Sequence, residues 1–355
     1  MLECATRKIV PNISATFGSG NEGLKVKAIT FERYGSPKVL MLAEMEMPVP
    51  KDREVLIKVR AAGVNPADYQ IAQGDVRFST GFTRPSQNTR LGYDVAGEIE
   101  AVGRKVTRFK TGDKVFGACI LRPHSLAVWL SGLGSFAEYA LSHEECLAPM
   151  PHNLTFEQAA AVPTAGWVAL QGLRTAVKIR PGNSVLISSA TGGIGTFAVQ
   201  IAKAFGARVT GVCSTDNLEL VRSLGADAVI DYRKQDYTKL GQRYDLIFDS
   251  IGEHSLFKLR RLLNPTGKVV FIGVRNVKPT SPKFLGRYLL AKALPKVVTS
   301  GSRPNLEDLM DLKNFLTRGV IKPVVEKTYP DLAAIPEAVQ YVKDGHAWGK
   351  VVVTI

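Results

Sequence analysis

The chain is 355 residues long, and at roughly 150 residues per domain this length predicts two domains. Hydrophobic residues make up 45% of the sequence and charged residues 22%, which excludes disordered, collagen-like and mucin-like proteins. The 46 Lys and Arg residues outnumber the 32 Asp and Glu residues, giving a net charge of +14. A field of this sign favours an anionic partner such as a phosphorylated cofactor, an acidic lipid or a nucleic acid.

Cysteine spacing and hydropathy indicate the cellular setting. The four cysteines are far apart in the sequence and form neither a dense disulfide framework nor a CxxC metal knuckle, which favours a reducing environment. No apolar stretch approaches the roughly 20 residues of a membrane-spanning helix, and no secretory signal is evident. We therefore expect a soluble, cytoplasmic protein. Residues 1–24 read as a flexible tail, and organelle targeting by Arg7 and Lys8 is the alternative, which Glu3 and Glu22 oppose.

The first part of the chain has the pattern of a β domain. A strand is expected over 26–31, and VLIKVRAAG places Val55, Ile57 and Val59 on one strand face. Further strands follow in VAGEIEAVG and TGDKVFG.

The pattern changes after Pro151 to alternating helices and strands. Thr155 and Gln158 have the spacing of a capping box before an alanine-rich helix. Five apolar strands then alternate with helix-length segments, which is typical of a parallel sheet covered on both faces. After Pro304 the sequence predicts a helix at LEDLMDLKNFLTRG and a last strand at KVVVTI. We predict an α/β fold with one domain over 25–150 and 305–355 and a second over 151–304.

A glycine-rich loop marks a cofactor site in the second domain. Ala190, Gly192 and Gly195 have GxGxxG spacing, with Ala in the first position, between a strand at 184–189 and a helix at 196–205. Gly192 lets the backbone approach a diphosphate, Gly195 lets helix and strand pack closely, and the helix N-terminus offers unpaired N–H groups. A glycine turn without a ligand is the alternative. The residues assigned to dinucleotide binding here are Ala190, Thr191, Gly192, Gly193, Ile194 and Gly195.

The end of the following strand favours NADPH over NADH. Val212, Cys213 and Ser214 include no carboxylate, whereas an NAD site usually has an acid here for the ribose. Ser214, Asn217 and Tyr232 can donate hydrogen bonds to a 2′-phosphate, although Asp216 is an unfavourable neighbour. The cations within reach are Arg222, Arg233 and Lys234.

Residues 25–355 resemble the medium-chain dehydrogenase/reductase superfamily, and within it the zinc-free, NADPH-dependent quinone oxidoreductase branch. The resemblance rests on AAGVNPADY, LGYDVAGEIEAVG, TGDKVFG, AAAVPTAGWVALQGL, SSATGGIGTFAVQIAK, LGADAVIDY and GHAWGKVVV. It implies a GroES-like β domain and a Rossmann doubly wound domain, with the active site in the cleft between them, and a homodimer.

The resemblance also implies a site without zinc. Zinc-dependent members carry a cysteine where this chain has Asn65 and a histidine where it has Tyr93, and the five histidines form no paired ligand motif. By resemblance, Asn65, Asp68 and Tyr93 line the substrate and nicotinamide end of the cleft, and Thr164 lies near the carboxamide. The remaining cofactor contacts are assigned to Gly273, His346, Ala347 and Trp348, where Trp348 replaces an arginine of the relatives.

Hydride transfer from nicotinamide to a quinone, or to the β-carbon of an enal or enone, is the reaction that such a site favours. Tyr93 is the first candidate to donate a hydrogen bond to the acceptor oxygen, Tyr69 is the second, and Asn65 is an orienting amide. Either tyrosine could instead pack without a chemical role. The alternative functions are an enoyl reductase, a non-catalytic dinucleotide-binding scaffold or nucleic-acid binder, and an alcohol dehydrogenase.

The segment from Lys278 to Arg303 carries several cations and no acid around FLGRYLLAKAL. A substrate lid, a dimer edge, a weak contact with acidic membranes, and a helix with a solvated basic face all fit this pattern. We expect no specific nucleic-acid partner, because neither an aromatic RNA platform nor a DNA-reading helix is visible.

Overall fold

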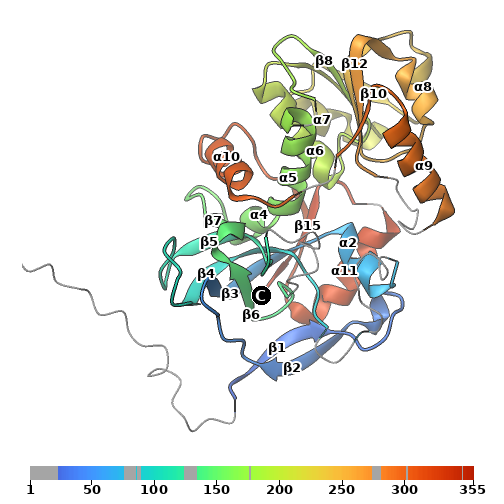
Figure 1. The fold of residues 1–355 in the computed structure, drawn as a ribbon. Helices are drawn as coiled ribbons and strands as arrows, with labels where there is room; N and C mark the ends of the chain where they lie inside the picture. Colours follow the sequence, from blue (N-terminus) through green and yellow to red (C-terminus); the bar gives the residue numbers. More distant parts are fainter. Residues whose placement is uncertain are drawn as a thin grey trace, which may run out of the picture.

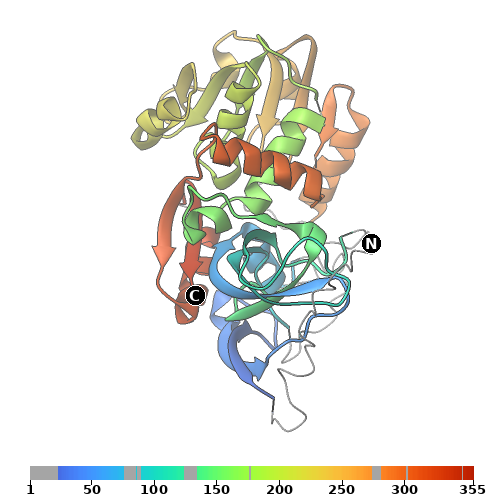
Figure 2. The same ribbon diagram turned by 90° about the vertical axis from the view of Figure 1, so that its left-hand side faces the viewer.

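The structure is a computed structural model that describes residues 23–75, 85, 89–123, 134–175, 177–273, 281–300, 303–345 and 347–355. Two large sheets occupy opposite ends of the molecule, and a two-stranded hairpin lies at the far end of the lower sheet (Figures 1 and 2). Residues 1–22 of the tail predicted over 1–24 lie outside the described residues, as do His346 and Lys278. Among those residues, none of the helices is long and apolar enough to span a bilayer.

The lower sheet is mostly antiparallel and contains strands from both ends of the chain. Its order is β14-β15-β3-β4-β5-β7, with β6 paired to β3. Val55, Ile57 and Val59 of β3 are buried in one core cluster, as their alternation predicts. The strands are β3 (Glu54–Val64), β4 (Asp94–Val102), β5 (Lys114–Ala118), β6 (Tyr139–His143), β7 (Leu147–Pro149), β14 (Val325–Tyr329) and β15 (Lys350–Thr354).

Short elements surround this sheet. The hairpin consists of β1 (Lys25–Thr30) and β2 (Met41–Glu46), and the helices are α2 (Pro66–Ala72), α4 (Phe156–Ala160) and α11 (Ile335–Asp344). The capping box predicted at Thr155 and Gln158 begins α4.

The upper sheet is parallel throughout and has the order β10-β9-β8-β11-β12-β13. Numbered from its first strand, this order is 3-2-1-4-5-6, which places a ligand crevice where β8 separates β9 from β11. The strands are β8 (Ser184–Ile187), β9 (Arg208–Cys213), β10 (Ala228–Asp231), β11 (Tyr244–Asp249), β12 (Leu263–Phe271) and β13 (Val297–Thr299). The helices are α5 (Pro163–Leu170), α6 (Gly193–Ala204), α7 (Leu218–Ser223), α8 (Leu256–Arg260), α9 (Pro282–Ala293) and α10 (Leu306–Thr317). The predicted fold class, a GroES-like β domain with a Rossmann domain, is confirmed.

The last strand returns to the lower sheet and determines where the site forms. β15 lies between β14 and β3, and Val351 pairs with Val64 in an antiparallel register. Because β15 begins beside the glycine loop of the upper sheet, it joins the two halves of the molecule. Lys350, its first residue, is thereby placed next to Asn65, which follows β3.

Candidate active site

The glycine loop between β8 and α6 has the shape of a diphosphate cradle. A Cβ atom on Gly195 would lie 1.7 Å from the carbonyl oxygen of Ser189, so helix and strand are in direct backbone contact there. Gly192 caps α6, whose first-turn N–H groups have no acceptor within the helix and point towards its N-terminus. The predicted loop residues therefore fit a dinucleotide.

The C-terminal strand closes one side of this cradle. The N–H of Gly349 donates to the carbonyl oxygen of Thr191 at 2.6 Å, and Gly192 and Gly349 form a parallel bridge. Ala347 and Trp348, which were assigned to the cofactor, lead directly into this contact, and Trp348 is 39% exposed.

A buried carboxylate lies where the two sheets meet. Asp94, the first residue of β4, accepts hydrogen bonds at Oδ1 from the N–H of Thr164 at 3.0 Å and from its hydroxyl at 2.6 Å. Its Oδ2 accepts from Nδ2 of Asn65 at 2.9 Å and from Nζ of Lys350 at 3.3 Å. Asp94 is fully buried and Lys350 is 4% exposed, so this charge pair is screened from water.

Asn65 and Asp68 are held by the start of α2. Asn65 is the N-cap, Pro66 is the first helical residue, and the Asn65 N–H donates to Oδ2 of Asp68 at 2.7 Å in a capping box. Asp68 is fully buried, and its Oδ1 has no hydrogen-bond partner among the described residues. Burial raises the pKa of Asp68 to about 7, although the Asn65 N–H and the nearby Lys350 charge act in the opposite direction.

The two candidate tyrosines differ in environment. Tyr93, one residue before β4, is 3% exposed and packs in the same cluster as Ile71 and Leu91. Burial, together with the Asp68 charge, raises the pKa of Tyr93, so its phenol remains neutral and able to donate. Tyr69 lies on α2 and is half-buried at the edge of the same cluster.

Sequence reasoning placed Thr164 near the cofactor carboxamide but did not assign Asp94 or Lys350 to the site. The structure gives the N–H and the hydroxyl of Thr164 a partner in Asp94. Asp94 stands in LGYDVAG and Lys350 in GHAWGKVVV, both motifs singled out in the sequence. The available signal was a charged residue at the start of each of two apolar strands, because buried charges need partners.

The predicted 2′-phosphate residues lie on the loops after β9 and β10. Nδ2 of Asn217 donates to Oγ of Ser214 at 3.0 Å, and Tyr232 is 51% exposed. A guanidinium nitrogen of Arg233 lies 2.7 Å from Asp216, so the acid that was expected to disfavour a phosphate is paired with a cation. Of the other cations, Arg222 pairs with Glu219, and Lys234 lies 3.9 Å from Asp231.

Gly273 follows β12 closely. A Cβ atom there would meet nothing within 4 Å among the described residues, so this part of the chain does not pack closely against the position.

The residues at the zinc position do not fit Zn²⁺. The side-chain oxygen Oδ1 of Asn65 already accepts from the Lys350 ammonium group at 2.6 Å, and the raised pKa of Tyr93 disfavours a phenolate ligand. Zn²⁺ sites use thiolate, imidazole and carboxylate ligands, and a lysine cation at the amide would repel the ion. Within the described ranges, no group of three or more His, Cys, Asp or Glu residues is arranged to hold a metal.

The basic segment forms α9 and β13 over its described part. Arg287 lies across the end of β11, where a guanidinium nitrogen is 3.3 Å from Oδ2 of Asp249 and 2.7 Å from the His254 carbonyl oxygen. The other oxygen of Asp249 accepts from the Ser188 hydroxyl at 3.0 Å. Leu285 and Leu289 remain exposed on the same helix, by 53% and 57%. One of the predicted cations is thus committed to an internal ion pair.

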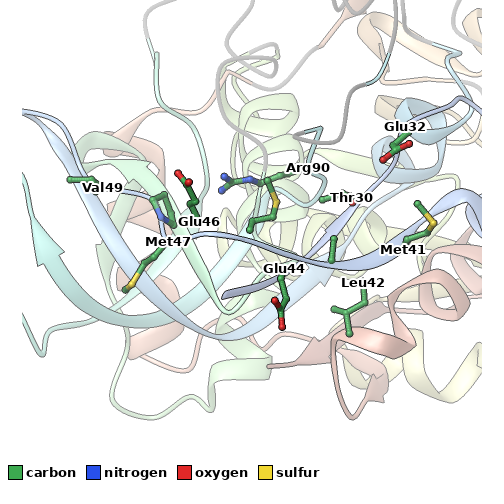
Figure 3. A pocket seen from close by; sticks show the side chains of 12 residues that line it. Thr30, Glu32, Met41, Leu42, Glu44, Glu46, Met47, Val49 and Arg90 are labelled. Atoms are coloured by element: carbon green, nitrogen blue, oxygen red, sulfur yellow. The ribbon is translucent and has the colours of Figure 1, made fainter. Parts of the chain in front are cut away.

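A separate groove of about 900 Å³ follows β2 (Figure 3). Figure 1 shows that β2 belongs to the hairpin at the far end of the lower domain. Its walls combine methionines with glutamates and one arginine. The lining includes Met41, Met45, Met47, Glu32, Glu44, Glu46 and Arg90. The groove includes none of the predicted site residues.

Comparisons with known proteins agree with this architecture. The model of the alcohol dehydrogenase GroES-like domain matches residues 51–152, and a model described as zinc-binding dehydrogenase matches residues 224–353. The chain is 37% identical over 336 residues to the NADPH-dependent alkenal/one oxidoreductase, chloroplastic, of Arabidopsis thaliana, covering 93% of this chain and 79% of that protein. It is 31% identical to the quinone oxidoreductase of Homo sapiens, covering 93% of this chain and 98% of that one.

The solved structure of the quinone oxidoreductase from Coxiella burnetii superimposes on this chain with a TM-score of 0.81 at 28% sequence identity. The match covers 94% of this chain and 100% of that one. The fold and the site define an oxidoreductase with a GroES-like domain and a Rossmann domain. The chain belongs to the medium-chain dehydrogenase/reductase superfamily, in its quinone oxidoreductase branch.

Proposed function

We propose that this protein is an NADPH-dependent reductase that transfers a hydride to a quinone or to the β-carbon of an enal or enone, without a metal. One observation carries the proposal. The glycine loop 190–195, which fits a dinucleotide, lies beside the buried hydrogen-bonded cluster of Asn65, Asp94 and Lys350, and this cluster does not fit Zn²⁺. The names of the relatives, an alkenal/one oxidoreductase and a quinone oxidoreductase, support the same reaction class.

NADPH, when bound, supplies the hydride from C4 of its nicotinamide ring. The first turn of α6 and residues 190–195 would hold the diphosphate, and Ser214, Asn217 and Tyr232 would hold the 2′-phosphate. Gly273, Ala347 and Trp348 would complete the contacts, together with His346, which lies outside the described residues. The absence of a carboxylate at the end of β9 and the pairing of Asp216 with Arg233 support NADPH over NADH.

The chain's own groups would stabilise the oxygen that becomes negative as the acceptor takes the hydride. The Asn65 amide and the Tyr93 hydroxyl are the donors for this oxygen, and each such donor contributes roughly 3 kcal/mol in known enzymes. Tyr93 would relay one proton from solvent to the reduced acceptor, so its own phenol is restored, and the hydride and this proton together complete the two-electron reduction. Tyr69 remains the second candidate for this proton transfer.

A screen of acceptors tests the function. Purified protein is mixed with NADPH or NADH and a quinone, an enal, an enone or an enoyl thioester, and loss of nicotinamide absorbance is followed. We expect turnover with NADPH and a quinone or enone. Turnover with enoyl thioesters alone would identify the enoyl reductase alternative. RNA binding that falls steeply with salt, without turnover of any acceptor, would favour the scaffold alternative.

Metal independence has its own test. Turnover should be unchanged after treatment with a strong chelator, and metal analysis should find no stoichiometric zinc in active protein. Tightly held zinc that is required for turnover would contradict the metal-free mechanism.

A homodimer is part of the proposal. β13 pairs with β12 alone among the described strands, so its other edge is available for a second copy, and Leu285 and Leu289 are exposed on neighbouring α9. Light scattering after gel filtration should give twice the chain mass of 38.6 kDa. A monomer at micromolar concentration would contradict this assembly.

We assign the basic segment a structural role, because Arg287 is paired with Asp249. Flotation with acidic liposomes tests the membrane alternative, which salt-sensitive binding would support.

A cytoplasmic location remains our expectation from the sequence. Imaging of the protein with a fluorescent fusion at its C-terminus tests this expectation against an organelle location.

A further inference from the structure

Lys350 is the one lysine of the described cluster around Asp94, and all its donors are in use. Its Nζ atom lies 2.6 Å from Oδ1 of Asn65, 3.3 Å from Oδ2 of Asp94 and 3.3 Å from the carbonyl oxygen of Val64. An ammonium group has three protons, so these three acceptors account for all of them. Lys350 therefore has no proton left for a substrate oxygen.

The acceptors of the cluster are equally committed. Asp94 receives four hydrogen bonds, two on each oxygen. The carboxamide nitrogen of Asn65 has two protons, and one of them goes to Asp94. Within the described part of the chain, the second proton has no acceptor. This second N–H of Asn65 is therefore the donor in the described network that remains for a ligand.

The charges on either side of Asn65 fix the orientation of its carboxamide. Lys350 can only donate and an ionised Asp94 can only accept, so a carboxamide turned by 180° would face both with the wrong group. The ammonium group at Oδ1 also polarises the amide and strengthens its N–H donors, since hydrogen bonds in a buried chain reinforce one another. Lys350 would therefore set both the direction and the strength of the Asn65 donor.

The same lysine contacts the cofactor loop. A Cβ atom on Gly193 would lie 3.0 Å from Cδ of Lys350, and Gly349, the preceding residue, is bonded to Thr191. The lysine stem thus lies against the cradle while its ammonium group orients Asn65. Lys350 therefore connects the cofactor loop with Asn65, the proposed hydrogen-bond donor to the substrate oxygen.

From this geometry we infer that Lys350 is a positioning residue for the reduction, acting through the carboxamide of Asn65 and not through contact with the acceptor. The inference rests on the proposed function, in which Asn65 donates to the acceptor oxygen. It predicts that removing the ammonium group slows turnover without weakening cofactor binding.

The test is a double-mutant cycle with methyl vinyl ketone as the enone probe. K350M should lower kcat by about 10-fold to 100-fold, and N65A by a similar factor, as expected when a donor to the developing oxyanion is lost or misdirected. Because both changes remove the same donor, K350M should have less than about a twofold further effect in the N65A background. The Kd for NADPH, measured by fluorescence, should change by less than about twofold in each variant.

Control variants separate positioning from folding. Lys203, on α6, also contacts three oxygens, two of Asp227 and one of Ala207, and K203M should leave kcat unchanged. The K350M/D94N variant removes the buried charges together, so it should recover the melting temperature that K350M loses without recovering kcat. If K350M does not fold, this double variant provides the kcat measurement, with N65A/K350M/D94N closing the cycle.

The outcomes distinguish a failure of the positioning role of Lys350 from a failure of the proposed function. Failure of the wild-type protein to oxidise NADPH with any acceptor would remove the proposed function. Normal wild-type turnover with an unchanged kcat in the folded lysine variants would overturn the role of Lys350 alone. Multiplicative effects of N65A and K350M would show that Lys350 does not act through Asn65, and recovery of kcat along with melting temperature would make its role structural.

Discussion

Thr164 and Asp94 are joined twice: the backbone N–H and the side-chain hydroxyl of Thr164 both donate to one carboxylate oxygen, at 3.0 and 2.6 Å. Thr164 lies in the first turn of α5 and Asp94 begins β4. A carboxylate at a helix N-terminus is stabilised by the helix dipole as well as by these bonds. The contact fixes α5 against the lower sheet, so the donors around Asp94 have a rigid support.

Tyr93→Phe tests the proposed proton donor. Removing the buried hydroxyl should lower kcat with an enone by about tenfold or more, while the Kd for NADPH changes by less than about twofold. Steady-state kinetics and cofactor titration measure the two quantities. Tyr139→Phe, in β6, is the matched control and should leave both unchanged. Unchanged kinetics in Tyr93→Phe would remove this hydroxyl from the mechanism and make Tyr69 the next candidate.

Asp68 should give the protein a pH-dependent stability. Its pKa is raised from 3.8 to about 7, so the folded protein binds more protons than the unfolded chain between these values. The contribution of Asp68 to the free energy of unfolding is therefore greatest below pH 3.8 and falls as the pH rises towards 7. Asp68→Asn removes the titration. Its melting temperature relative to wild type should increase between about pH 5 and pH 7, and a constant difference across this range would contradict the assignment.

Asp216→Asn tests the basis of cofactor preference. The substitution removes a negative charge beside the assigned 2′-phosphate residues and releases Arg233 from its 2.7 Å ion pair. Because the pair is exposed, the gain is modest: the ratio of kcat/KM for NADPH to that for NADH should rise about threefold to tenfold at low salt. Asp52→Asn, which breaks a surface pair with Lys105, is the control. A ratio that does not change would place the 2′-phosphate elsewhere.

Gly195→Ala tests the close packing of the cofactor loop. A Cβ atom would lie 1.7 Å from the Ser189 carbonyl oxygen, so α6 must move away from β8. We expect a loss of about 3 kcal/mol or more in the free energy of unfolding, measured with urea, and weaker NADPH binding. Gly286→Ala, on α9, where a Cβ atom would meet no described residue within 4 Å, should instead be neutral or stabilising by up to about 1 kcal/mol. Equal stability of the two variants would be inconsistent with this packing.

Local patterns in the sequence predict the elements of this fold well. The glycine spacing and the strand before it lead to α6, where Ala198, Ile201 and Ala202 are fully buried. The predicted helix after Pro304 is α10, over Leu306–Thr317. These predictions succeed because periodicity, caps and glycine geometry act within a few residues of one another.

The candidate site was less accessible to the same reasoning. Lys350 and Asn65 are 285 positions apart, and nothing local indicates that β15 runs beside β3. Asp94 resembles an ordinary polar residue at the start of a strand until its burial is known. Long-range pairing decides these contacts, and a single sequence contains no direct signal for it.

The position of β15 has a consequence for how the protein is made. The lower sheet includes β15, which is translated after all the other described strands of that sheet. The six parallel strands of the Rossmann unit, β8 to β13, are all translated before that strand. Synthesis therefore imposes an order of assembly in which the nucleotide-binding half is able to fold early, while the half that supplies Asn65 and Asp94 is completed only once β15 has been made.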